Sequence, residues 1–399
     1  MIDVRAARNA PDDYRRRLAR KGAAETFDAW LAADERWRAL VPRVDELRAR
    51  TKLAGKPTPE QLEELRAAKE ELQRAEQELA EAEQARDEAL AQVPNPPDDS
   101  APDGFTEEDA VVVRSFGEPI LPAEPKEHTE IGRFDMERAA RLSGSRFGYL
   151  IGDTALLALA LYRFALDVAV RHGHVPMLPP VLVREAAMYG TGFFPTDRSN
   201  IYAIESDELY LTGTSEVALA GLHMGEILAR DELPLRYTAF STNFRREAGA
   251  AGKDTRGMFR VHQFNKVELF VFCEPAASRD EHERLVAIEE EILQALGIPY
   301  RVVDVAAGDL GAPAAKKYDI EGWFPFQQRY RELTSASNTT DFQARRLGVR
   351  YRVGKSLEPV HTLNGTATTD RTVLAILENF QGEVPDVLKR YGAPERVAR

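Results

Sequence analysis

Two segments that read as strands, residues 236–245 and 259–272, constrain the fold of this chain more than any other feature. Side chains of a strand alternate between its two faces. One face of the second segment therefore gathers charged side chains around an aromatic ring: Arg260, His262, Phe264, Lys266 and Glu268. The opposite face is mostly apolar: Phe259, Val261, Gln263, Asn265, Val267, Leu269 and Val271. A sheet that carries large side chains on both faces is usually covered on both. Because covered charges need partners, we expect the charged face to carry a polar site.

The charged face of this predicted sheet has the chemistry of a nucleotide site. Arg245, at the end of the first segment, and Glu247, two residues further on, share a face, and a loop rich in Gly, Lys and Arg joins the two segments. Guanidinium groups hold phosphates through forked hydrogen bonds, and an aromatic ring stacks on a flat base. The pattern predicts a site for a polyanion with a base and an amine. The alternative is a solvated sheet face that binds no ligand.

Length and composition narrow the remaining possibilities. With 399 residues, 43% of them hydrophobic, the chain is expected to form two or three globular domains. The net charge of −12 argues against indiscriminate nucleic-acid binding, although screening over about 10 Å leaves room for a local basic face. The single cysteine, Cys273, excludes an internal disulfide and a Cys-rich zinc site. It is predicted to be a buried thiol within a strand.

The sequence predicts neither secretion nor membrane insertion. Charged residues follow soon after Met1, unlike the start of a secretory signal. The most apolar segment, residues 154–162, is far shorter than the roughly 20 residues that a transmembrane helix needs. We therefore expect a soluble, cytoplasmic protein with no membrane partner.

Residues 28–92 are predicted to form an antiparallel helical hairpin that turns near residues 55–59, where Gly and Pro interrupt the pattern. The second helix has a heptad seam of leucine and alanine: Leu65, Leu72, Leu79, Ala68, Ala75, Ala82 and Ala89. The first helix offers a facing stripe, interrupted by Pro42: Leu31, Leu40, Val44, Leu47 and Leu53. A Pro- and Asp-rich linker follows, so we expect an N-terminal domain at 1–104 and a second domain at 105–399.

Basic residues of this hairpin crowd toward its turn. Residues 36–56 hold seven Lys or Arg against two acids, whereas residues 57–91 hold four against eleven. Long helical hairpins often serve dimerisation or spacing. The gathering of basic residues toward the turn of this hairpin favours contact with a phosphate backbone instead.

The second domain contains neither a P-loop nor a Gly-x-Gly-x-x-Gly motif, so arginines must hold the phosphates if ATP binds. Residues 244–268, with Phe-Arg-x-Glu, a short loop and Arg-x-x-x-Phe, closely resemble motif 2 of class II aminoacyl-tRNA synthetases. The run Arg-Val-His-Gln-Phe-x-Lys-Val-Glu is similar to this motif in the seryl-tRNA synthetase family.

Further segments resemble the same family in the same order along the chain. They are a helix and strand ending at Pro180 (motif 1), Tyr-Gly-Thr-Gly at 189–192, Thr-Gly-Thr-Ser-Glu at 212–216, residues 330–346, and residues 362–379 (motif 3). The resemblance implies an α+β fold. A class II catalytic domain, with a mixed, mainly antiparallel sheet and flanking helices, follows an N-terminal antiparallel coiled-coil arm. The segment between Asn364 and Arg371 is expected to be a loop.

The resemblance also implies a reaction, in which serine attacks the α-phosphate of ATP and the seryl group then moves to tRNA(Ser). It implies Arg245 at the α-phosphate, Arg371 at the γ-phosphate, and Glu332 with Ser335 at Mg²⁺; Arg245, Glu332 and Arg371 are the catalytic set. Phe264 is implied to stack on adenine and Glu247 to receive its amino group. The implied ATP-binding set is Arg245, Arg246, Glu247, Arg260, Val261, Phe264, Glu332, Leu333, Thr334, Ser335 and Arg371.

Serine and tRNA sites are implied in the same way. The implied serine-binding set is Thr214, Ser215, Glu216, Arg245, Glu268 and Thr366. The implied tRNA-binding set, in which the arm grips the long variable arm of tRNA(Ser), is Arg43, Arg48, Arg50, Lys52, Lys56, Lys253 and Arg256. Motif 1 implies a homodimer.

Two other functions are compatible with these motifs. A paralogous enzyme could pass serine from seryl-adenylate to another acceptor, in resistance or natural-product biosynthesis. A non-catalytic tRNA-binding module could retain the fold alone. The helical arm argues against the first alternative, and the intact set of charged motif residues argues against the second.

Overall fold

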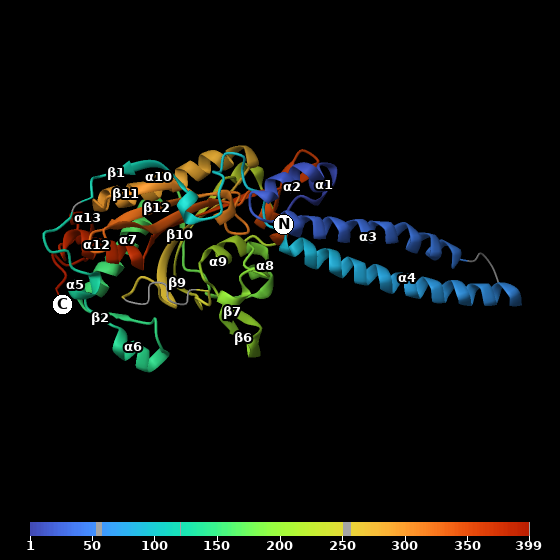
Figure 1. The fold of residues 1–399 in the computed structure, drawn as a ribbon, viewed down its shortest axis with the longest axis horizontal. Helices are drawn as coiled ribbons and strands as arrows, with labels where there is room; N and C mark the ends of the chain where they lie inside the picture. The colour runs from blue at the N-terminus through green and yellow to red at the C-terminus, as the bar shows by residue number, and fades with distance from the viewer. Residues whose placement is uncertain (53–57, 120, 250–256, 399) are drawn as a thin grey trace. The chain divides into compact units, whose positions relative to one another are not determined.

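The computed structural model describes residues 1–52, 58–119, 121–249 and 257–398. The chain divides into two compact units, residues 1–96 and 97–399 (Figure 1). Within the described residues, none of the helices combines the length and the apolar character that a membrane span requires.

The N-terminal unit consists of helices. They are α1 (Val4–Asn9), α2 (Pro11–Ala19), α3 (Ala24–Arg50) and α4 (Pro59–Gln92). Phe27 and Trp30 of α3 pack with Leu18 of α2, Leu90 of α4 and Val93. This small core fastens the base of the two long helices.

Helices α3 and α4 lie side by side along the predicted seam (Figure 1). Val44 and Leu47 pack against Ala75, and the alanines Ala68 and Ala82 are also buried. Because alanine is small, it allows the two helices to approach closely. Helix α3 continues through Pro42 without a break. The expected turn at residues 55–57 and the expected stripe residue Leu53 fall outside the described residues.

The second unit is built on an eight-stranded sheet. Neighbouring strands pair antiparallel, except that β4 pairs parallel with β9. This mixed, mainly antiparallel sheet confirms the expected fold class. The strand order is β1 (Val111–Phe116), β11 (Tyr300–Asp304), β12 (Lys316–Phe324), β13 (Arg329–Asn338), β16 (His361–Thr369), β10 (Gln263–Cys273), β9 (Leu235–Phe244) and β4 (Val175–Met177).

Helices cover both faces of this sheet, as the side-chain alternation predicts. On one face, Val267, Leu269 and Val271 of β10 pack with three long helices. On the other face, Phe270 and Phe272 pack with two short helices. The long helices are α7 (Asp153–Arg171), α10 (Ser278–Leu296) and α12 (Asp370–Phe380); the short ones are α9 (Glu216–Gly221) and α11 (Phe342–Leu347).

Shorter elements complete the second unit. The helices are α5 (His128–Ile131), α6 (Met136–Ser143), α8 (Glu185–Thr191) and α13 (Asp386–Lys389). The strands are β2 (Phe134–Asp135), β3 (Tyr149–Leu150), β5 (Leu182–Arg184), β6 (Ala203–Ile204), β7 (Leu209–Leu211), β8 (Ile227–Leu228), β14 (Arg350–Val353) and β15 (Ser356–Pro359). Single 3-10 turns lie at Glu107–Asp109, Arg198–Asn200, Glu205–Asp207, Arg230–Glu232, Pro275–Ala277 and Ala307–Asp309.

The structure corrects two expectations about strands. Strand β10 begins at Gln263, so residues 259–262 approach it as irregular chain and do not belong to the strand. The expected loop between Asn364 and Arg371 is wrong, because residues 361–369 form β16 in the middle of the sheet. This strand is rich in Thr and Gly, and its pairing on both sides outweighs that weak local preference.

Candidate active site

The hairpin of β9 and β10 forms the floor of the site. Its register places Phe264 opposite Asn243 and Lys266 opposite Ser241. Beyond the paired residues, the Arg245 amide donates to the His262 carbonyl at 2.9 Å and closes the hairpin end. Phe264 and Lys266 thus point to the same side of the sheet, which is the face expected to be charged.

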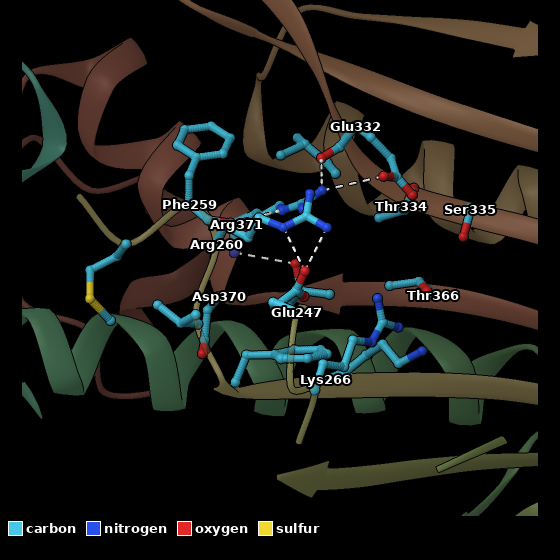
Figure 2. A pocket seen from close by; sticks show the side chains of 16 residues that line it. Glu247, Phe259, Arg260, Lys266, Glu332, Thr334, Ser335, Thr366, Asp370 and Arg371 are labelled. Atoms are coloured by element: carbon cyan, nitrogen blue, oxygen red, sulfur yellow. Dashed lines mark hydrogen bonds and ion pairs between the residues drawn. The ribbon is translucent and has the colours of Figure 1, made fainter. Parts of the chain in front are cut away.

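A cavity opens above this floor (Figure 2). Five segments line it: the chain just after β9, residues 258–261, and parts of β10, β13 and the β16–α12 junction. The lining residues are Arg245, Glu247, Met258, Phe259, Arg260, Val261, Phe264, Lys266, Glu332, Leu333, Thr334, Ser335, Thr366, Thr369, Asp370 and Arg371. Four of these side chains are cationic, as expected of a site that holds phosphates without a glycine-rich loop.

A second cavity adjoins the first. Its walls include Thr214, Glu216, Ser337 and Asn364. The two cavities have five lining residues in common: Arg245, Lys266, Glu332, Ser335 and Thr366. The site therefore has two compartments that meet at one group of charged and hydroxyl side chains.

Two strand bulges decide which side chains reach this meeting point. In β13, Thr334 and Glu332 pair with the successive residues Ile320 and Glu321, so Leu333 is the extra residue. A strand without a bulge would place residues 332 and 335 on opposite faces, whereas the bulge returns Glu332 and Ser335 to the same face.

The second bulge lies in β16, where Lys266 and Glu268 of β10 pair with Thr369 and Thr366. Ala367 is the residue most naturally counted as extra, because Val267 still pairs with Thr368. Both threonines consequently share a face with Lys266 and line the first cavity.

Ion pairs hold the cationic side chains of the first cavity in place (Figure 2). The Arg260 guanidinium donates to Glu247 at 2.5 Å, and Arg371 donates to the Glu332 carboxylate at 3.3 Å. Glu247 has a φ of 54°, a left-handed conformation that non-glycine residues adopt at a cost of about 1–3 kcal/mol. Arg245 lies over the Phe264 ring, with its guanidinium carbon 5.2 Å from the ring centre.

Glu332 stands where three cations converge. Desolvation by itself would raise the pKa of the Glu332 carboxyl, but Lys317, Arg371 and Arg245 outweigh it and hold that pKa below its ordinary value. Its side chain keeps 45% of its surface exposed. Beside it, burial raises the pKa of Asp319 to about 7, and the Lys317 ammonium lies 2.8 Å from that carboxylate. The Glu332 carboxylate is thus ionised and accessible, so its oxygens are available to bind a metal ion.

The second compartment surrounds a buried glutamate, Glu216, at the start of α9. Gln343 and Asn364 donate side-chain hydrogen bonds to its carboxylate at 2.7 and 3.0 Å. Deeper in the sheet, Glu268 receives a hydrogen bond from the Thr214 hydroxyl at 2.6 Å and forms an ion pair with Lys266. One carboxylate, Glu216, therefore lines the second compartment, and another, Glu268, lies beneath its wall.

We expect the charge of Glu216 to make folding stability depend on pH. Burial, and next the nearby Glu268, raise the pKa of Glu216 from 4.5 to about 7. Because the folded-state pKa is raised, the associated stability is fully present below about pH 4.5 and is lost as the pH rises to about 7. Wild type should therefore lose roughly 2–3 kcal/mol relative to Glu216→Gln over this range.

Urea unfolding of both proteins at pH 5, 6, 7 and 8 measures this difference. Glu108→Gln, at an exposed position, is the control and should follow wild type at every pH. A constant difference between wild type and Glu216→Gln across the series would contradict the assigned burial cost.

Three residues expected in the site line neither compartment. Arg246 is exposed, and its backbone amide donates to the Asn200 carbonyl. Ser215 is buried at the N-terminus of α9. Glu268 is only 1% exposed and lies beneath Lys266 and Thr214, so it acts on the pocket through them. The remaining expected ATP and serine residues line at least one compartment.

The basic residues expected to contact tRNA form ion pairs along the arm. Arg43, Arg48 and Arg50 of α3 lie 3.6, 2.9 and 3.7 Å from glutamates of α4, and all three are more than half exposed. Lys52 is exposed just beyond the end of α3. Lys56, Lys253 and Arg256 lie outside the described residues.

Several residues of the site were missed by sequence reasoning. Gln343 and Asn364 hold Glu216, Lys317 and Asp319 flank Glu332, and Asp370 receives hydrogen bonds from Asn265 and Tyr162. Burial raises the pKa of Asp370. The alternation of Lys317 and Asp319 along a strand was an available signal. For Gln343, only the tertiary contact reveals the role.

Comparison with known proteins places this architecture in one class. Residues 201–380 match the model of the tRNA synthetase class II core domain (G, H, P, S and T), and residues 1–97 match that of the seryl-tRNA synthetase N-terminal domain. The second unit thus contains the core domain of a class II aminoacyl-tRNA synthetase.

Individual relatives extend over the whole chain. The serine–tRNA ligase of Acidothermus cellulolyticus is 48% identical over 98% of both chains, and that of Thermobifida fusca is 48% identical over 98% of this chain and 97% of its own. The crystal structure of seryl-tRNA synthetase from Pyrococcus horikoshii complexed with ATP matches with a TM-score of 0.92 and 39% identity, covering 100% of this chain and 99% of that one. The cytoplasmic serine–tRNA ligase of Naegleria fowleri, in complex with AMP, gives 0.86 and 33% over 97% and 95%. The chain belongs to the seryl-tRNA synthetase family.

Proposed function

We propose that this protein activates L-serine with ATP to form seryl-adenylate and transfers the seryl group to tRNA(Ser). The observation that carries the proposal is the pair of adjoining cavities that share Arg245, Lys266 and Thr366. One cavity places four cationic side chains around Phe264 and suits a nucleotide, and the other carries carboxylate and hydroxyl groups and suits a hydroxyl-bearing amino acid. Their common wall is where a carboxylate could attack an α-phosphate.

ATP occupies the first compartment, around Phe264, in this proposal. Phe264 stacks on adenine, and Glu247 receives the adenine amino group, held toward the cavity by Arg260. Arg245, which lines both compartments, binds the α-phosphate. Arg371, in the first turn of α12, binds the γ-phosphate together with that helix end. The chain supplies no nucleophile; it holds reactants in line and neutralises developing charge.

The oxygen ligands around Glu332 fit a magnesium ion that ATP carries. Mg²⁺ prefers oxygen ligands and is bound in many sites by one or two carboxylates plus substrate phosphates. Glu332 is ionised and accessible, and Ser335 shares its face through the β13 bulge. No group of three or more His, Cys, Asp or Glu side chains suitable for a metal occurs within the described part of the chain. The ion would therefore draw further ligands from phosphate and water, and its contribution is to neutralise phosphate charge.

Serine occupies the second compartment, around Glu216. Glu216 offers negative charge for the serine ammonium group, and Glu268 supports the pocket from beneath through Thr214 and Lys266. Thr214 and Thr366 offer hydroxyl groups. A site built to hydrogen-bond a substrate hydroxyl rejects analogues without one, because its own polar groups are then left unpaired. This supports selection of serine over alanine and glycine.

Pyrophosphate exchange tests the proposed function directly. Exchange between ATP and labelled pyrophosphate is measured with serine, threonine, alanine and glycine in turn, followed by charging of total tRNA. We expect exchange only with serine, and charging of a tRNA fraction. Exchange without charging would indicate another acceptor, and neither activity would leave a binding module.

The proposal extends to the tRNA partner and to the cellular location. The helical arm presents Arg43, Arg48, Arg50 and Lys52 near its distal end, and their exposed guanidinium and ammonium groups suit a phosphate backbone.

Charging of tRNA serves translation, so we place the activity in the cytoplasm.

We further propose that the protein is a homodimer and that α7 and residues 175–178 form its interface. Leu156 and Leu159 of α7 are 48% and 60% exposed, and Val175 and Leu178 are 53% and 84% exposed. Helix α7 contacts β4, and exposed apolar side chains gathered on adjoining elements mark an interaction site.

Charge introduced on this surface should dissociate the dimer. We expect the double variant Leu159→Glu, Leu178→Glu to elute with half the wild-type molar mass in size-exclusion chromatography with light scattering. Leu142→Glu, also at an exposed leucine, is the matched control and should keep the wild-type mass. A monomeric wild type would overturn the proposal.

A further inference from the structure

A buried histidine and glutamate lie behind the wall of the nucleotide compartment, in a place to which the proposed reaction assigns no role. His128 of α5 and Glu378 of α12 have side chains that are 1% and 0% exposed. Their Nδ1 and Oε1 atoms are 2.8 Å apart. Neither residue lines either compartment.

The other nitrogen of the His128 ring holds the main chain of the cavity wall. The Met258 amide donates to His128 Nε2 at 3.3 Å. Nε2 therefore accepts, which leaves the ring proton on Nδ1 to be donated to Glu378. The result is a relay from the Glu378 carboxylate through a neutral imidazole to the backbone of Met258.

The chain beside this ring has no space for a larger residue. Gly257 has a φ of 68°, and a Cβ atom built on it would lie 2.7 Å from His128 Nε2. The backbone thus passes directly against the imidazole edge. This close approach explains why glycine precedes Met258.

Helix α12 holds the same short segment at a second point. Arg371, in the first turn of the helix, donates to the Phe259 carbonyl at 3.3 Å. Glu378, two turns further along, reaches Met258 through His128. Met258, Phe259, Arg260 and Val261 then line the nucleotide compartment in succession. One helix therefore sets both the proposed phosphate-binding arginine and the wall that faces it.

We propose that His128 is a positioning residue for nucleotide binding. By accepting the Met258 amide while donating to Glu378, it fixes residues 258–261 against α12 in the geometry that receives ATP. The link to ATP rests on the function proposed above, whereas the anchoring of the segment does not.

Two substitutions at this position separate the two hydrogen bonds. In His128→Asn the amide nitrogen takes the place of Nδ1 and still donates to Glu378, but no acceptor reaches Met258. In His128→Gln the amide oxygen takes the place of Nε2 and still accepts from Met258. We expect His128→Asn to raise KM for ATP roughly fivefold, the loss of one hydrogen bond, with KM for serine unchanged. His128→Gln loses the donation to Glu378 but keeps the contact with Met258, so its KM for ATP should rise less, by at most about twofold.

Hydrogen exchange of the ligand-free protein provides a readout that needs no substrate. The peptide covering residues 257–262 should exchange faster in His128→Asn than in His128→Gln or wild type. His174→Asn, at a histidine that is 2% exposed and outside both compartments, is the control for buried histidine loss and should change neither KM nor this peptide.

The outcomes distinguish the two proposals. The proposed anchoring role of His128 would be overturned if His128→Asn had the wild-type KM for ATP and the wild-type rate of hydrogen exchange in residues 257–262. Equal effects of the Asn and Gln variants would also overturn it. If His128→Asn does not fold, Gly257→Ala displaces the same segment from outside the core and must raise KM for ATP; a wild-type value there also overturns the anchor. Absence of serine-dependent activity in wild type would refute the proposed function alone, because the hydrogen-exchange comparison needs no substrate and still tests the anchoring role of His128.

Discussion

Replacement of Arg245 by alanine is expected to lower serine-dependent ATP–pyrophosphate exchange by at least about a thousandfold. Arg245 lines both compartments, and its Nε donates to the Gly213 carbonyl at 3.3 Å, which fixes the guanidinium beside the common wall. Loss of one preorganised donor to a developing charge costs about 10²–10³ in rate, and a guanidinium fork supplies two donors. The effect should appear in kcat as well as in KM for ATP.

Two further variants sharpen this test. Arg245→Lys keeps the charge but loses the fork, so its rate should lie between those of alanine and wild type. Arg230→Ala removes an exposed arginine that pairs with Glu274 at the surface, and should exchange at the wild-type rate. Near-normal exchange by Arg245→Ala would end the assignment of the α-phosphate to this residue.

Shortening the helical arm is expected to abolish tRNA charging and to leave serine-dependent exchange within about twofold of wild type. The cut should preserve the small core of Phe27, Trp30 and Leu90, which a longer deletion would destroy. Replacing residues 42–80 with a short Gly-Ser turn meets this condition and removes Arg43, Arg48, Arg50 and Lys52. Each phosphate contact contributes salt-dependent affinity, so we expect kcat/KM for tRNA to fall at least about a thousandfold.

Alanine at Arg43, Arg48 and Arg50 in the full-length arm provides the matched comparison. If these residues contact phosphates, charging should weaken and its dependence on salt concentration should become shallower. Efficient charging by the shortened protein would show that the arm is dispensable. Loss of exchange as well would mean that the cut had damaged the catalytic body.

Much of the fold was accessible from the sequence because its signals are local. The heptad spacing of alanine and leucine predicted the arm, and Ala68, Ala75 and Ala82 are buried in it. Alternation along residues 259–272 predicted a sheet covered on both faces, and β10, which begins at Gln263, packs against helices on both. Residues 361–369 were mistaken for a loop, since threonine and glycine favour a strand only when neighbours on both sides pair with it.

The candidate site likewise has features that the sequence reveals and features that only the tertiary structure reveals. Arginines, glutamates and the phenylalanine of the motifs were recognisable by type and order, and Arg245, Glu247, Phe264, Glu332 and Arg371 all line one cavity. Their ion pairs were not recognisable, because Arg371, at the start of α12, reaches Glu332 of β13 only in the folded chain. The same holds for Gln343, whose amide reaches Glu216 from a different helix.

The amino-acid sequence by itself determined the inventory of this protein: a helical arm, a layered sheet, and a set of guanidinium, carboxylate and hydroxyl groups without a glycine-rich phosphate loop. The tertiary structure decided which of these groups share a face. Counting by two separates Glu332 from Ser335 and Thr366 from Thr369, and the bulges in β13 and β16 bring each pair together. A bulge forms where a strand adjusts to the register of its neighbours, so it is a property of the assembled sheet and cannot be read from one strand alone.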